Sequence, residues 1–318
     1  MRVVITGGAG FLGARLIEEL LGEHSRMRPD EIMAIDRVPC PVVDPRVRAC
    51  VGTITDHEWL ASLVTGNITH VWHLAAVLSG QSEAEPDLAM TVNVDATSSL
   101  LACCRSLATR PRFVFASTVA VFGGPLPPVV PADFPVRPQS TYGTSKAIAE
   151  LLVLEQTRRG AVDGLACRVP TVAIRPGAPN SAMSSFVSGI VREPVRGVDT
   201  VCPVPPDTRL WVASPATTVR NLAHAGLVAA DRLGELRTID LPGSTVTPAR
   251  MLDALERTAG PEARARVRYQ IDPAIARIVQ TWPGAFDVSR AEALGFVNDE
   301  DADAIVGQFV RDHPRAGG

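Results

Sequence analysis

The N-terminal stretch restricts the fold more than any other feature of the sequence, because it joins a short apolar run to a glycine-rich turn and a helix. Arg2 to Thr6 is a β-branched run with the character of a buried strand. Gly7 to Gly13 follows directly, and apolar side chains then recur at helical spacing from Ala14 to Leu21. Strand, glycine turn and helix in this order open the βαβ units of doubly wound sheets. We therefore expect an α/β fold with a parallel, doubly wound (Rossmann) sheet.

The spacing of the glycines predicts a dinucleotide site at this turn. Gly7 permits the tight turn, Gly10 lets the backbone approach a pyrophosphate, and Gly13 lets the helix pack closely on the strand. Phe11 and Leu12 stand at the helix start, where free N–H groups face the phosphates. Glycine triplets also occur in purely structural turns, so the assignment needs support from elsewhere in the chain.

An acidic residue gives that support. Residues 32–35 form a second apolar run, and Asp36 ends it about 20 residues beyond the glycines. A carboxylate there accepts hydrogen bonds from both hydroxyls of the adenosine ribose and repels a 2′-phosphate. We therefore expect NAD rather than NADP, a preference that the neighbouring Arg37 would weaken.

The ends of later strands offer further contacts for the cofactor. Apolar runs predict strands over 47–51, 69–73 and 112–116. Thr53 and Ile54 follow the first of these and are candidates to border the adenine. Small side chains follow the second, where a cofactor must cross the end of the strand, at Leu74, Ala75 and Ala76.

A tyrosine followed four residues later by the chain's single lysine predicts a catalytic base. All other basic residues are arginines. On a helix, Tyr142 and Lys146 share a face, so the ammonium lies near the phenol. A cation there favours the phenolate and lowers the tyrosine pKa below its usual value of about 10. We expect this pair to act as a base near neutral pH.

Composition excludes several other classes of function. The net charge of -3 gives no general attraction to nucleic acid or to an anionic membrane. No apolar run approaches the roughly 20 residues that span a bilayer, and the start of the chain lacks the pattern of a secretory leader. The cysteines and histidines show no metal-ligand spacing. We expect a cytoplasmic protein that binds no metal.

Prolines become frequent in the second half, where the regular alternation ends. We expect an NAD-binding domain over 1–170 with a return segment around 212–242. Residues 171–211 and 243–318 would form a smaller substrate-binding lobe. Helical spacing predicts helices over 219–233 and 248–258.

With these residues placed, the chain resembles the extended short-chain dehydrogenase/reductase family, in its branch of nucleotide-sugar epimerases and dehydratases. The resemblance covers essentially the whole length. It rests on the motifs Thr6-Gly7-Gly8-Ala9-Gly10-Phe11-Leu12-Gly13, Asp36, His73-Leu74-Ala75-Ala76, Asn93, Val121-Phe122-Gly123 and Tyr142-x-x-x-Lys146. These motifs are specific for fold and cofactor, but not for substrate.

The resemblance implies roles for individual residues. Tyr142 would be the base, and Lys146 would bind the nicotinamide ribose and lower the tyrosine pKa. Thr118 would orient the substrate, with Ser117 beside it at the pocket wall, and Asn93 would support the lysine. The family also pairs long helices, here those from Pro86 and from Gly143, in a four-helix bundle between subunits, which implies a homodimer.

A narrower resemblance is to NAD-dependent dehydrogenases that oxidise the C2 hydroxyl of D-erythronate, a four-carbon sugar acid. It rests on the segments 168–180, 184–194 and 207–211. A guanidinium can hold a carboxylate with two parallel hydrogen bonds. The candidates for the substrate carboxylate are Arg175, Arg192 and Arg209, and those for its hydroxyls are Ser79, Asn180 and Ser184.

Two other functions remain open at this point. A nucleotide-sugar 4-epimerase or dehydratase with bound NAD would use the same Tyr142 and Lys146. A non-catalytic NAD-binding regulator would keep the fold but would have no need of that pair.

Overall fold

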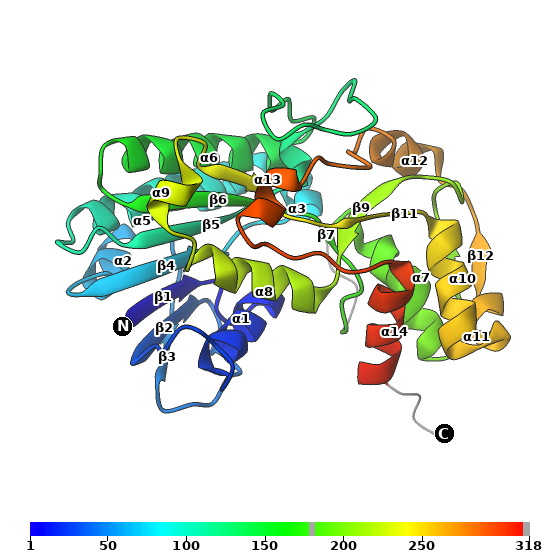
Figure 1. Ribbon diagram of the computed structural model, residues 1–318, viewed down its shortest axis with the longest axis horizontal. Helices are drawn as coiled ribbons and strands as arrows, with labels where there is room; N and C mark the ends of the chain where they lie inside the picture. The colour runs from blue at the N-terminus through cyan, green and yellow to red at the C-terminus, as the bar shows by residue number, and fades with distance from the viewer. Residues whose placement is uncertain (178–181, 314–318) are drawn as a thin grey trace.

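The computed structural model, which describes residues 1–177 and 182–313, is organised around a seven-stranded parallel sheet (Figure 1). Its strands are β1 (Arg2–Thr6), β2 (Glu31–Asp36), β3 (Val47–Val51), β4 (Ile68–His73), β5 (Arg112–Thr118), β6 (Asp163–Val169) and β10 (Thr238–Asp240). They lie in the order β10-β6-β5-β4-β1-β2-β3. The winding reverses between β1 and β4, and sheets of this kind bind ligands outside the carboxyl ends of their strands at that point. The expected doubly wound fold is confirmed.

Helices cover both faces of this sheet. On one face, α1 (Phe11–Leu21) and α8 (Pro215–Ala225) bury side chains such as Leu16 and Leu222 against it. On the other face, Leu60, Leu100 and Val153 come from the helices α2 (His57–Leu63), α5 (Ala96–Arg105) and α6 (Thr141–Arg158). Because both faces are covered, the strands read as nearly continuous apolar runs.

A second core lies beyond the carboxyl ends of the strands, on the right of Figure 1. It contains two small sheets, formed by β7 (Thr171–Val172), β9 (Leu210–Ala213) and β11 (Ser244–Val246), and by β8 (Thr200–Cys202) and β12 (Val267–Tyr269). Its helices are α7 (Ser185–Val195), α10 (Pro248–Ala259), α11 (Pro261–Ala265), α12 (Pro273–Val279) and α14 (Ala302–Asp312). Ala291 of α13 (Ser289–Ala293) packs into the core of the large sheet instead. The expected domain boundaries stay a prediction.

The expected helix over 219–233 is wrong in its limits. α8 ends at Ala225, and a separate short helix, α9 (Ala230–Leu233), follows. The break falls at Gly226, where a Cβ would lie 2.5 Å from the Trp72 ring, so the chain passes close to the sheet there. None of the helices in the described chain is both long and apolar enough to cross a membrane.

The segment before α6 carries elements that the sequence did not predict. The helix expected from Pro86 consists of α4 (Pro86–Met90), a π-helical turn η1 (Thr91–Asp95) and α5. An additional helix, α3 (Ser79–Ala84), precedes it, and a 3-10 turn, η2 (Val119–Val121), follows β5. Both α3 and the end of β5 border the site described next.

Candidate active site

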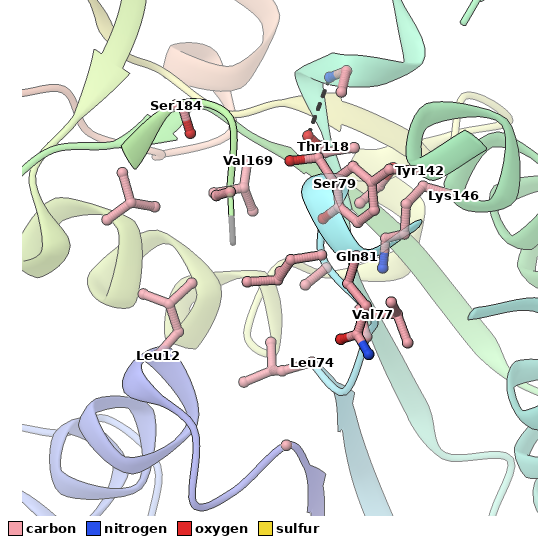
Figure 2. Close-up of a pocket in the computed structure, with 18 of the residues that line it drawn as sticks. Leu12, Leu74, Val77, Ser79, Gln81, Thr118, Tyr142, Lys146, Val169 and Ser184 are labelled. Carbon is pink, nitrogen blue, oxygen red and sulfur yellow. Dashed lines mark hydrogen bonds between the residues drawn. The ribbon is translucent and has the colours of Figure 1, made fainter. Parts of the chain in front are cut away.

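A cavity of about 660 Å³ runs along the carboxyl ends of the strands of the large sheet. The glycine turn and Asp36 line one end, and Tyr142 and Lys146 line the other. Trp282, which packs against the second core, also lines it. Figure 2 shows the part of the cavity around Tyr142, with Leu12 and Leu74 on the far side from Thr118. The volume is in the usual range for ligand and cofactor sites.

The glycine turn leaves no room for side chains. Gly7 has a φ of +74°, which favours glycine, and its N–H donates to the Ile35 carbonyl at 2.8 Å. A Cβ on Gly7 would lie 2.8 Å from the Ala75 nitrogen, and one on Gly13 would lie 2.0 Å from the Gly7 oxygen. Gly7, Gly10 and Gly13 also line the cavity, so the backbone at the start of α1 is open to a diphosphate, as NAD requires.

Asp36 is held in position at the end of β2. One carboxylate oxygen accepts the Ala9 N–H at 3.0 Å, and the other accepts the Arg37 N–H at 2.7 Å. Each oxygen keeps a further lone pair for a ribose hydroxyl. These contacts fit the adenosine end of a dinucleotide.

The residues suggested for the cofactor line the cavity, with one exception. The lining includes Gly7, Gly10, Phe11, Leu12, Gly13, Asp36, Thr53, Ile54, Leu74, Ala75, Ala76, Tyr142 and Lys146. Asn93 lies behind the wall. Its side chain accepts the Val77 N–H at 2.8 Å and donates to the Ser145 hydroxyl at 3.0 Å, so it joins η1 to α6.

Thr118, Tyr142 and Lys146 meet at the other end of the cavity (Figure 2). Ser140 caps α6 by accepting the Gly143 N–H at 3.0 Å, which fixes the turn that carries Tyr142. The Thr118 hydroxyl accepts the Ala120 N–H at 3.1 Å. Because that contact uses only an oxygen lone pair, the hydroxyl proton can be donated to a ligand oxygen.

Burial changes the proton affinities of both α6 residues. It raises the pKa of Tyr142 to about 12. It also lowers the pKa of Lys146 to about 7, although the Glu150 carboxylate acts in the opposite direction. The expected lowering of the tyrosine pKa by Lys146 is therefore wrong for the chain by itself, since loss of hydration disfavours both charged forms. The Lys146 ammonium lies 4.0 Å from the centroid of the Phe115 ring.

A buried polar network supports the wall behind these residues. Glu150 accepts a hydrogen bond from the Ser117 hydroxyl and pairs with Arg168 through bonds of 2.8 and 3.0 Å. Arg168 also lies 3.5 Å from Asp240, whose pKa burial raises to about 6. Ser117 thus lines the cavity while its proton is directed away from it.

The residues suggested for the substrate separate into three groups. The structure places Ser79, Ser117, Thr118, Tyr142, Arg175 and Ser184 in the cavity wall. Arg192 is outside the wall, because its guanidinium is buried against Glu193 at 2.6 Å and donates to the Arg175 carbonyl. Arg209 is exposed and also outside the wall. Asn180 lies outside the described residues.

Several wall residues had no signal in the sequence. Gln81 comes from the unexpected α3, and Gln139 from the proline-rich loop before α6. Trp282 follows α12 and reaches the cavity only through the packing of the second core. Trp211 lies in one of the quoted motifs, but its place in the wall depends on β9. Within the described ranges, no three His, Cys, Asp or Glu side chains gather to hold a metal ion.

Known proteins match the chain over nearly its whole length. The model of the NAD dependent epimerase/dehydratase family matches residues 3–225. A D-erythronate dehydrogenase of Cupriavidus necator is 46% identical, with 98% of both chains covered. A protein of the same name from Haemophilus influenzae is 42% identical over 98% of this chain and 99% of its own. The expectation of NAD as cofactor is confirmed.

Solved structures share the same architecture. A nucleoside-diphosphate-sugar epimerase of Agrobacterium tumefaciens is 34% identical, with a TM-score of 0.93 over 98% of this chain and 94% of its own. An L-threonine 3-dehydrogenase of Trypanosoma brucei is 25% identical, with a TM-score of 0.87 over 98% and 97%. The second core therefore belongs to the shared fold as much as the large sheet does.

Proposed function

The chain belongs to the NAD dependent epimerase/dehydratase family and is an NAD-dependent dehydrogenase, and on this premise we propose that it oxidises the C2 hydroxyl of a small sugar acid such as D-erythronate to the 2-oxo acid. The observation that carries the proposal is the meeting of Thr118, Tyr142 and Lys146 at one end of the cavity. The names of the two dehydrogenase relatives support the substrate class.

The catalytic steps follow from the positions of these three residues. Tyr142 removes the proton of the C2 hydroxyl as general base. The Thr118 hydroxyl donates a hydrogen bond to the same oxygen and so orients it. NAD supplies the acceptor for the hydride that leaves C2 as the carbonyl forms. Below its pKa of about 7, Lys146 holds a cation beside the reacting groups and favours the phenolate.

Neutral side chains line the remaining substrate end. Ser79, Ser184 and Gln81 line the same cavity as Tyr142 and Thr118 and offer two hydroxyls and an amide (Figure 2). The Ser79 hydroxyl accepts the Met183 N–H at 3.2 Å, so its proton is free for a ligand. We propose that these groups bind the substrate hydroxyls.

The activity is tested by offering four- to six-carbon aldonic acids with NAD and following NADH absorbance. We expect steady NADH formation with D-erythronate or a close relative, and slower formation with NADP because Asp36 repels the 2′-phosphate. If no aldonic acid supports NADH formation, the substrate class is wrong. Steady turnover also excludes a non-catalytic NAD-binding regulator.

A nucleotide-sugar epimerase or dehydratase is the second candidate, and the similarity to the Agrobacterium tumefaciens structure favours it. Such an enzyme must hold a nucleoside diphosphate beside a permanently bound NAD. Calorimetric titration with uridine and thymidine diphosphates distinguishes the two candidates, because only the second requires tight binding.

We also propose that the protein is a homodimer paired through α5 and α6. The outer face of α6 exposes Leu151 by 64%. Ile148 and Leu154 are only half-buried on the same helix.

We expect Leu151→Asp to convert a dimeric mass in light scattering into a monomeric one, because a charge would be buried in the apolar pairing face. Leu236→Asp, at an exposed leucine before β10, should keep the dimer. A monomeric mass for the unchanged chain contradicts the proposal.

A further inference from the structure

The side chain of Arg175 is a cation in the cavity wall without a carboxylate partner. None of the ion pairs among the described residues includes it. Its guanidinium carbon lies 5.5 Å from the centroid of the Phe11 ring. Phe11 is the first residue of α1, directly after the glycine turn. The unpaired charge is therefore located at the phosphate end of α1.

Helix α7 makes hydrogen bonds to both the N–H and the carbonyl group of Arg175. The Arg175 N–H donates to the Ser188 hydroxyl at 3.1 Å, and Arg192 donates to the Arg175 carbonyl at 3.1 Å. Arg192 is only 1% exposed, and Glu193 compensates its charge. The second core thus fixes the chain at Arg175, and the Arg175 guanidinium has no ion-pair partner among the described residues.

Two anions enter the cavity during the proposed reaction, the cofactor diphosphate and the substrate carboxylate. The substrate position is marked by Thr118 and Tyr142, whereas Phe11 marks the open N–H groups that receive the diphosphate. We propose that Arg175 binds the diphosphate of NAD rather than the substrate carboxylate. The guanidinium fork suits phosphate oxygens and lies next to the helix start that already attracts them. Through this contact, bound NAD joins the second core to the large sheet.

The inference rests on the NAD site of the proposed function and does not depend on the identity of the sugar acid. ADP-ribose separates the two, because it carries the diphosphate but cannot accept a hydride. Calorimetry with Arg175→Met should show about 10- to 100-fold weaker ADP-ribose binding, the usual effect of losing charge-assisted hydrogen bonds. Arg175→Lys should lose less, since it keeps the charge without the fork.

The matched control is Arg15→Met. Arg15 lies 4.9 Å from the centroid of the same Phe11 ring but does not line the cavity, so this variant should bind ADP-ribose as the unchanged protein does. At saturating NAD, the KM for the sugar acid should stay unchanged in Arg175→Met. Unchanged ADP-ribose affinity together with a raised sugar-acid KM would overturn the inference and return Arg175 to the substrate carboxylate. If no sugar acid is turned over, the proposed function is wrong, whereas the ADP-ribose affinities still decide the role of Arg175.

Discussion

Tyr142→Phe should lower dehydrogenase turnover by about 10²- to 10⁴-fold, the usual contribution of a general base. The variant keeps the aromatic ring and the Ser140 cap of α6, so the cavity wall keeps its shape. ADP-ribose binding should therefore be unchanged, because the contacts of the glycine turn and Asp36 do not involve the phenol oxygen. Steady-state kinetics and calorimetry on the same preparation check the two halves of this result.

The other tyrosine of the chain is the matched control. Tyr269 is exposed on β12, outside the cavity wall, and Tyr269→Phe should turn over normally. Turnover of the unchanged enzyme should rise with pH up to about 7 and level off above it. Burial raises the pKa of Tyr142 to about 12, so the phenolate is the minor form and gains with pH, but Lys146, whose pKa is lowered to about 7, loses its charge above that value. Near-normal turnover of Tyr142→Phe with intact ADP-ribose binding would falsify the base assignment.

The features that the sequence predicted well are those that depend on a short piece of chain. Gly7 supplies the positive φ of the turn, and Gly13 packs so closely on it that a Cβ would lie 2.0 Å from the Gly7 oxygen. Asp36 reaches the cavity because it ends a strand beside β1. Tyr142 and Lys146 share a helix face, so their spacing alone brings them together. Each of these arrangements is set within one strand-helix-strand unit or one helix.

The features that could not be predicted depend on packing between distant segments. Arginines 175, 192 and 209 were equal candidates for an anion, and only the fold of α7 pairs Arg192 with Glu193 and leaves Arg175 unpaired. The direction of the Tyr142 pKa shift was wrong because spacing shows the nearby cation but not the loss of water around the phenol. Trp282 reaches the wall through the second core, where it follows α12, a helix that the sequence did not predict.

Lys146→Met should make the protein more stable and much less active. Lys146 is 1% exposed, packs on the Phe115 ring and has no ion pair among the described residues, so the fold holds a charge with little compensation. Methionine has a similar length and loses the desolvation cost, and we expect about 1–4 kcal/mol more free energy of unfolding. Turnover should fall by about 10² or more, because no cation then stabilises the Tyr142 phenolate. Urea unfolding without cofactor and steady-state kinetics measure the two effects.

The gain in stability should depend on pH in a defined direction. The pKa of Lys146 is lowered from 10.5 to about 7 in the folded chain. Between these values the unfolded chain binds one more proton, so the stability of the unchanged protein rises with pH there. Below about pH 7 the lysine is charged in both states and its cost is complete, whereas above its unfolded pKa the cost is gone. The advantage of Lys146→Met should therefore be largest below about pH 7 and shrink toward pH 10.

The control is Leu101→Met. Leu101 is also buried at 1% exposure, and this variant should change the free energy of unfolding by less than about 1.5 kcal/mol at every pH. A gain for Lys146→Met that stays constant from pH 6 to 10 would mean that the buried ammonium is not its source.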